Sequence, residues 1–206
     1  DEVLTFRAVL TDIADNTTNG SDTSTITVDE TVPTLSNVSL ASNNLTDTLA
    51  KAGNTVTATF TASETIQTPT VTFSDANNDV VAGSVSYSNT SGDTWVASYV
   101  TDASDADGAV TYSIEFSDTA GNAGTDVTSG SGSVTFDDTK PTMTITSTTS
   151  GVTDGSTTND ATIALKFTSD EATIDFAAND VLVSNGTLSD FASPSTTVYT
   201  ATFTPA

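Results

Sequence analysis

The chain has 206 residues, 35% of them hydrophobic, and its 4 Lys and Arg face 27 Asp and Glu, giving a formal net charge of −23. Nucleic acid and anionic membrane surfaces are excluded as direct partners, because both are bound through clustered Lys and Arg. The absence of Cys and His excludes disulfides, thiol chemistry and zinc sites built on those residues. We expect no membrane insertion, since no apolar run is long enough to span a bilayer.

Two stretches of the sequence recur after about one domain length. LTFRAVLTDIADN (4–16) matches VTYSIEFSDTAGN (110–122) 106 residues later, and TITVDETVPT (25–34) matches SVTFDDTKPT (133–142) 108 residues later. Both stretches alternate apolar and polar residues, as a half-buried strand requires. The repeat predicts three segments: the last two strands of one unit (1–28), one complete unit (29–136), and the first five strands of a third unit (137–206).

The complete unit contains a series of short alternating runs. In residues 55–62, for example, Val56, Ala58 and Phe60 share one face, and Trp95 is expected to be buried in a later strand. Short strands with turn-rich connections are typical of an immunoglobulin-like sandwich. We therefore predict an all-β fold of tandem immunoglobulin-like Greek-key β-sandwiches, one complete and two partial. The expected strands of the complete unit are 35–41, 55–62, 69–74, 81–88, 94–100, 110–116 and 133–136.

Acidic residues cluster where this topology brings loops together. Because successive strands alternate in direction, the start of the first strand, the second–third loop and the sixth–seventh loop share one end of the sandwich. Carboxylates that converge there repel one another unless a cation intervenes, and calcium prefers carboxylate and carbonyl oxygens. We therefore predict Ca²⁺ at this end. The expected ligands are Asp29, Glu30, Glu64, Asp118 and Asn122 in the complete unit, and Asp137, Asp138, Asp170 and Glu171 in the third.

The opposite end of the complete unit carries the run DASDADG, which contains Asp102, Asp105 and Asp107. This run is expected to face the joint that holds Asp137 and Asp138. One interpretation is a second, bridging cation site, and the other is a solvated acidic turn, which Asp and Gly favour by themselves.

Without His or Cys the usual hydrolytic triads cannot form, and paired carboxylates in turns do not make the cleft that glycoside hydrolysis needs. We therefore expect no enzymatic activity.

Three motifs carry a family resemblance: DDTKPT at 137–142, TASE at 61–64 and SDTAGN at 117–122. Together they resemble the bacterial Ig-like repeat domains of large calcium-dependent surface adhesins and S-layer-type surface proteins, and residues 141–206 look like a related variant. The resemblance implies a repeated extracellular, cell-surface spacer that calcium rigidifies at its joints. The sequence departs from the pattern at Glu30, which replaces an Asp of the joint motif, and at TSDE (168–171), which replaces TASE.

The expected function is a non-enzymatic spacer or stalk in an adhesin or fibre, whose partners are adjacent Ig-like repeats of the same or neighbouring chains. Two alternatives stay open: a self-assembling S-layer or filament subunit, and a carbohydrate-binding accessory module. The partial units are expected either to belong to a longer chain or to complete one another head to tail, as a homopolymer. In both cases Leu4, Phe6, Ala8 and Leu10 should pack against a sandwich that residues 29–136 of the same copy do not supply.

Overall fold

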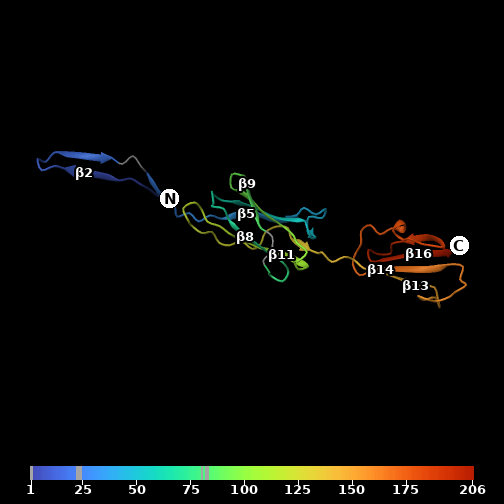
Figure 1. Ribbon diagram of the computed structural model, residues 1–206. Coiled ribbons are helices and arrows are strands. Elements are labelled where there is room, and N and C mark those ends of the chain that lie inside the picture. The colour runs from blue at the N-terminus through green and yellow to red at the C-terminus, as the bar shows by residue number, and fades with distance from the viewer. Residues whose placement is uncertain (1, 22–24, 80, 82–83) are drawn as a thin grey trace. The chain divides into compact units, whose positions relative to one another are not determined.

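A computed structural model describes residues 2–21, 25–79, 81 and 84–206 of the chain. It contains two compact units, Asp1–Asp138 and Thr139–Ala206, which are described separately. Strands dominate both units, and the helical structure of the described residues is the short 3₁₀ helix η1 (Ala178–Asp180) (Figure 1). The predicted all-β class and its immunoglobulin-like sandwich are confirmed.

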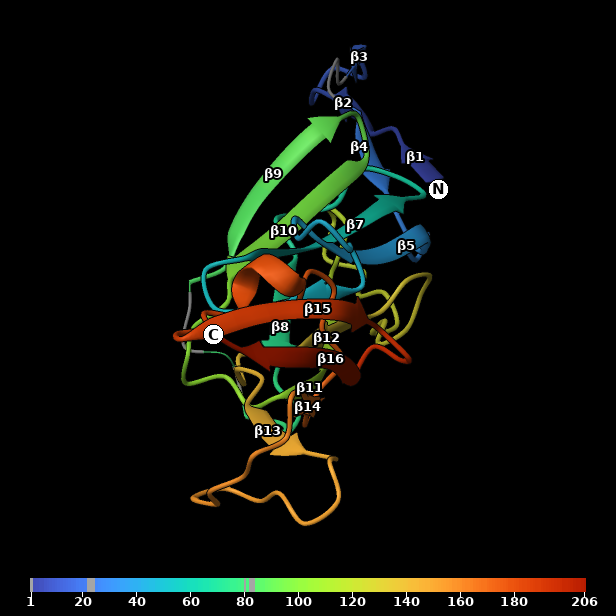
Figure 2. The same cartoon turned by 90° about the vertical axis from the view of Figure 1, so that its right-hand side faces the viewer.

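Two four-stranded sheets form the sandwich of the first unit. The first sheet is antiparallel, and Figure 2 shows its strands β9 and β10 side by side. It has the order β5 (Leu35–Ser42), β7 (Thr55–Ala62), β10 (Thr94–Val100), β9 (Ser86–Ser91). The second sheet has the order β6 (Leu49–Ala50), β12 (Val134–Phe136), β11 (Gly108–Glu115), β8 (Thr70–Ser74), in which β6 and β12 are parallel.

Alternation in the sequence explains which side of each strand enters the core. In β7, Val56, Ala58 and Phe60 are fully buried while the Thr residues between them are only half-buried. Period-two burial of this kind is what a pleated strand imposes when one sheet face meets another. Across the core, the rings of Phe73 and Tyr99 lie 4.8 Å apart between centroids. The sandwich therefore closes on side chains from both sheets.

Trp95 differs from the sequence expectation of burial. It is half-buried and packs against the core. The register of β10 against β9 shifts between Thr94 and Trp95, so the indole belongs to an irregular end of the strand rather than to its regular centre. The core position opposite Trp95 is filled by Phe60.

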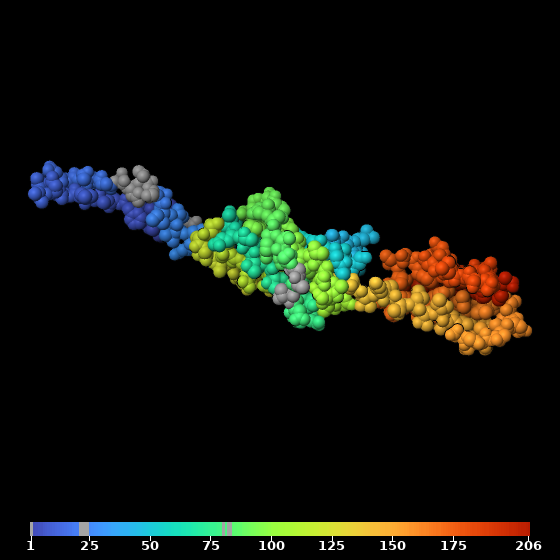
Figure 3. Space-filling view, viewed as in Figure 1, coloured from blue at the N-terminus to red at the C-terminus, as the bar shows by residue number. Residues whose placement is uncertain are grey.

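Residues 2–28 form two short antiparallel pairs, β1 (Glu2–Leu4) with β4 (Ile26–Val28) and β2 (Arg7–Thr11) with β3 (Thr17–Ser21). In the space-filling view the described residues of this segment are drawn in blue and form a narrow strip (Figure 3). Its large apolar side chains are exposed, with Phe6 at 55% and Leu10 at 59%. They do not belong to the core of the first unit.

The second unit is built on one four-stranded antiparallel sheet. Its core consists of Phe167, Tyr199 and Ala201, with Phe176 and Phe191 packed against them. The sheet has the order β13 (Met143–Ser147), β14 (Ile163–Ser169), β16 (Val198–Pro205), β15 (Gly186–Ala192). This order repeats the first sheet of the sandwich, β5–β7–β10–β9, strand for strand.

The predicted strands 55–62 and 94–100 have the observed bounds, and most of the others differ by one or two residues. The expected strand 81–88 lies partly outside the described residues, and the strand found there, β9, begins later, at Ser86. In the second unit η1 occupies the place where a third strand was expected. Among the described strands of the sandwich, the equivalent strand β8 pairs with β11, and the sheet of the second unit contains no counterpart of β11.

Candidate metal centre

Three carboxylates meet at one end of the sandwich. Asp29 directly follows β4, Glu64 lies two residues after β7, and Asp118 lies in the turn after β11. One carboxylate oxygen from each lies within 4.8 Å of the other two. The alternating strand directions of the Greek key bring these turns together although the residues are up to 89 positions apart in sequence.

Asp118 is the buried member of the group, with only 1% of its surface exposed. Its Oδ1 accepts hydrogen bonds from the backbone N–H groups of Gly121 and Asn122 at 2.6 and 2.8 Å, and its Oδ2 accepts one from Asn122 Nδ2 at 2.7 Å. Burial opposes ionisation, but the bonds from Asn122 and from the turn backbone outweigh it and hold the pKa of Asp118 below its usual value. Asp118 is therefore a fixed, ionised carboxylate.

Asn122 connects this turn to the joint. Its Nδ2 also donates a hydrogen bond to the backbone carbonyl of Asp29 at 3.0 Å. The tight turn that places Asn122 requires a left-handed residue, which Gly121 supplies with φ +101°. Asn122 therefore orients two members of the carboxylate group through its amide nitrogen.

Glu64 is the carboxyl group whose ionisation this arrangement disfavours. Its partial burial raises its pKa, and the negative charges of Asp29, Asp118 and Asp93 raise it further. Asp93 is an acidic neighbour that sequence reasoning missed, because it lies in the turn between β9 and β10, outside the three loops that the topology singles out. A carboxylate with a raised pKa beside a fixed anion is the group that a bound cation would neutralise.

The donor set fits a hard divalent cation. Calcium takes six to eight oxygen ligands in flexible geometry, and carboxylates, backbone carbonyls and water supply them in proteins. Asp29, Glu64 and Asp118 would hold the ion through their carboxylate oxygens, and the ion would cancel the repulsion that raises the pKa of Glu64. Glu30, the other predicted ligand at this end, is exposed and lies outside the group of three.

The acidic run at the opposite end forms a network of hydrogen bonds to backbone. Asp102 Oδ1 accepts from the N–H of Ser104 at 2.9 Å, Asp105 Oδ2 from the N–H of Asp102 at 3.0 Å, and Asp107 Oδ1 from the N–H of Asp138 at 2.8 Å. Asp138 Oδ1 in turn accepts from the N–H of Ala52 at 3.2 Å. The run therefore does meet the joint residue Asp138, through hydrogen bonds that need no cation.

A buried acid that the sequence did not single out supports this end. Asp75 is 6% exposed and accepts hydrogen bonds from the N–H groups of Ala106, Asn77 and Asp79 at 2.9 to 3.0 Å. The bond from Ala106 is the largest cause that lowers its pKa. Asp75 is thus an anchor for the acidic run. It was missed because Asp-x-Asn-x-Asp between strands looks like any polar turn.

The remaining predicted ligands do not converge as the first three do. Asp137 donates its backbone N–H to the carbonyl of Ala50 at 2.8 Å, which continues the β6–β12 pairing. In the second unit Asp170 accepts hydrogen bonds from the N–H and Oγ1 of Thr142 at 2.7 and 2.6 Å, and these bonds lower its pKa. Its neighbour Glu171 is half-buried. Among the described residues, Asp29, Glu64 and Asp118 form the acidic group close enough to share one ion.

The comparison with protein families agrees with this architecture. Residues 137–206 match the family model described as bacterial Ig-like domain. This part of the chain is similar to bacterial Ig-like domains, so the resemblance seen in the sequence is confirmed for it. Domains of this family are typically non-enzymatic and are commonly surface-exposed. No curated protein matches the chain. In the described part of the chain, no helix has the length and apolarity needed to cross a membrane.

Proposed function

We propose that the chain is an extracellular spacer of tandem Ig-like repeats, in a cell-surface adhesin or fibre, whose joints are stiffened by calcium. The observation that carries the proposal is the convergence of Asp29, Glu64 and Asp118 within 4.8 Å at the point where the chain enters the sandwich. Asp29 lies between β4 and β5, so it belongs to the joint, whereas Glu64 and Asp118 belong to the body of the sandwich. A cation shared by the three would tie the joint to the body.

The physical effect of the ion follows from the charges. Without it, the joint carboxylate of Asp29 and that of Glu64 repel, as the raised pKa of Glu64 indicates. With it, the same groups become ligands, and the segment before β5 loses freedom to bend. Calcium in the 10⁻⁴–10⁻³ M range, the usual range of extracellular modules, would occupy such a site outside a cell.

Where the chain leaves the sandwich, hydrogen bonds within the first unit hold the backbone after β12. The N–H of Asp138 donates a hydrogen bond to Asp107 Oδ1, and the N–H of Ala52 donates one to Asp138 Oδ1, so the exit from β12 is fixed. A spacer needs restricted joints, because a flexible chain spans a distance that grows only with the square root of its length. The high net negative charge adds self-repulsion, which keeps such a chain soluble and extended.

Thermal unfolding in calcium, in magnesium and in chelator at fixed ionic strength tests the proposal. A ligand that binds only the folded state stabilises it by mass action, so calcium at ten times its Kd should stabilise by about 1.4 kcal/mol. Glu64→Gln should lose most of the calcium response. Glu30→Gln, a neighbouring exposed acid outside the group, is the matched control and should keep it. Equal melting curves for the unsubstituted protein in calcium and in chelator would contradict the proposal.

A further inference from the structure

The sheet of the second unit has one apolar face. Antiparallel partners that lie directly opposite share a face, and the register pairs Ile145 with Phe167 and Phe167 with Tyr199. The same face carries Met143, Leu165, Ala201 and Phe203, by the same pairing. The alternate positions of these strands, on the other face, are rich in Thr. Such an alternation is the pattern of a sheet with a core on one side and solvent on the other.

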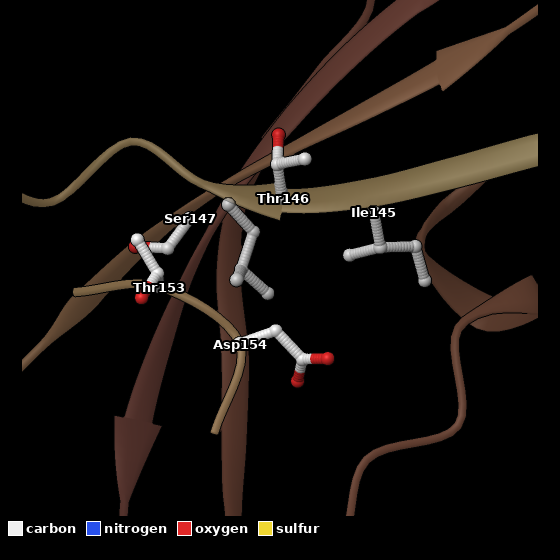
Figure 4. Close-up of a pocket in the computed structure, with 6 residues that line it drawn as sticks. Ile145, Thr146, Ser147, Thr153 and Asp154 are labelled. Carbon is white, nitrogen blue, oxygen red and sulfur yellow. The ribbon is translucent and has the colours of Figure 1, made fainter. Parts of the chain in front are cut away.

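Part of this apolar face is uncovered. Phe176 and Phe191 pack over Phe167 and Tyr199, but at the β13 side of the sheet Met143 is 36% and Ile145 58% exposed. An open hollow of about 480 Å³ lies there, lined by Ile145, Ser147 and Leu165 together with Thr153 and Asp154 of the following loop. Figure 4 shows Ile145 beside this hollow, with Asp154 on the loop that borders it.

The first unit shows what covers the corresponding face. There the sheet β5–β7–β10–β9, which has the same strand order, packs against the second sheet, and the paired strands β11 and β12 lie at the centre of that sheet. The inward residues of these two strands are buried, with Val110 at 7%, Val134 at 1% and Phe136 at 1% exposure. The interface between a β5-type sheet and a β11–β12 pair is therefore established within the chain.

Residues 2–28 repeat the β11–β12 pair in the same register. The partners Glu2–Val28, Val3–Thr27 and Leu4–Ile26 correspond one by one to Gly108–Phe136, Ala109–Thr135 and Val110–Val134. The correspondence extends to the turns. Asp12 accepts from the N–H and Nδ2 of Asn16 at 2.9 Å, as Asp118 does from Asn122.

Within the part of the chain that the structure describes, no sheet covers the repeated pair. Leu4 is 39%, Ile26 53% and Val28 37% exposed, whereas Val110, Val134 and Phe136, at the equivalent positions, are between 1 and 7% exposed. The chain thus presents both halves of one known interface, each with its apolar side uncovered: the pair of residues 2–28 and the sheet of residues 143–205.

We propose that the strand pairs of residues 2–28 of one copy cover the apolar face of the second-unit sheet of another copy, in the manner in which β11 and β12 cover the first sheet of the sandwich. The contact joins two different surfaces, so copies of this chain associate head to tail. Both segments carry net negative charge, which opposes the contact. Assembly is therefore strengthened by salt, which screens this repulsion.

Sedimentation velocity from micromolar to several hundred micromolar protein, at low and at high salt, tests the proposal. The unsubstituted chain should form a ladder of oligomers that grows with concentration and salt. Ile26→Asp and Ile145→Asp, which place a charge in one half or the other, should each leave monomers. Leu45→Asp, at an apolar residue that is 99% exposed outside both halves, should leave the ladder unchanged. The urea transition of Trp95, the one Trp of the chain, reports the folded sandwich of the first unit in each variant. Far-UV circular dichroism, compared with the unsubstituted chain, shows whether Ile145→Asp keeps the sheet of the second unit.

A mixture of the two defective variants gives the sharpest result. The Ile26→Asp chain keeps its sheet intact and the Ile145→Asp chain keeps its strand pairs intact, so the mixture should form dimers and stop there. Nonspecific association through exposed apolar groups does not produce a capped dimer. Three results would overturn the proposal: a monomer at every concentration, oligomers that persist in either single variant, or a mixture that stays monomeric.

Discussion

The substitution Phe136→Ala asks directly whether the sandwich closes as described. Phe136 is 1% exposed and ends β12, between β11 and the parallel strand β6. A buried aromatic side chain removes about 150–250 Å² from water, which at about 25 cal/mol per Å² corresponds to about 4–6 kcal/mol for the whole side chain. Alanine keeps part of this area and leaves a cavity, so we expect a loss of about 3–5 kcal/mol in the free energy of unfolding.

The assay is urea unfolding followed by tryptophan fluorescence. Trp95 is the one Trp of the chain and packs against the core that contains Phe136, so the signal reports this sandwich alone. With a urea slope of about 2 kcal/mol per M, the midpoint should fall by about 2 M. Phe6→Ala, at an aromatic residue 55% exposed outside this core, is the control and should not move the Trp95 transition. A loss below about 1 kcal/mol for Phe136→Ala would refute the assignment of β12 to the core.

Three further substitutions probe the metal centre and the backbone. The folded structure raises the pKa of Glu64 above 4.5, so ionisation of this carboxyl group destabilises the fold as pH rises. Glu64→Gln should therefore raise the melting temperature in chelator at pH 7. An unchanged or lower melting temperature would contradict the assigned repulsion. The pKa of Asp118 is lower in the folded protein than its ordinary value of 3.8, so its ionised form stabilises the fold above pH 3.8, and this stability is lost as pH falls through the pKa of the folded state. Asp118→Asn should therefore lower the melting temperature at neutral pH and weaken the fall of the melting temperature below pH 4. Calorimetry between pH 2 and 7 measures both effects. Gly132 has φ +73°, and a Cβ there would strike the carbonyl oxygen of Leu40. Gly132→Ala should therefore lower the free energy of unfolding by about 1–3 kcal/mol in the same urea assay. An unchanged free energy would mean that this close approach of Gly132 to β5 is misplaced.

The strands that the sequence predicted well are those with a buried face. Residues 55–62 and 94–100 alternate apolar and polar side chains because their strands lie in the middle of a sheet and meet the core. The edge strand β9 is exposed along its whole length, so its sequence SYSNTS carries no alternation, and the predicted range 81–88 was displaced. The two-residue strand β6 is too short to show any period, and only its parallel pairing with β12 reveals it.

The residues of the candidate site also differ in how far the sequence predicts them. The approach of Asp29, Glu64 and Asp118 follows from strand order alone, since it depends on which turns share an end of the sandwich. The contributions of Asp93 and Asp75 depend on how individual turns fold back, which no spacing in the sequence encodes. Glu30 neighbours Asp29 in the sequence, but it is exposed and lies outside the acidic group.

The width of the distance distribution across the first joint shows whether a bound cation stiffens the spacer. The chain has no Cys, so Thr18→Cys in β3 and Thr90→Cys in β9, both exposed, can carry a fluorophore pair for single-molecule energy transfer. The distribution should be broad in chelator and should narrow with calcium, with half of the change in the 10⁻⁴–10⁻³ M range. The same labelled chain with Glu64→Gln should stay broad. Equal widths in calcium and in chelator would contradict the account.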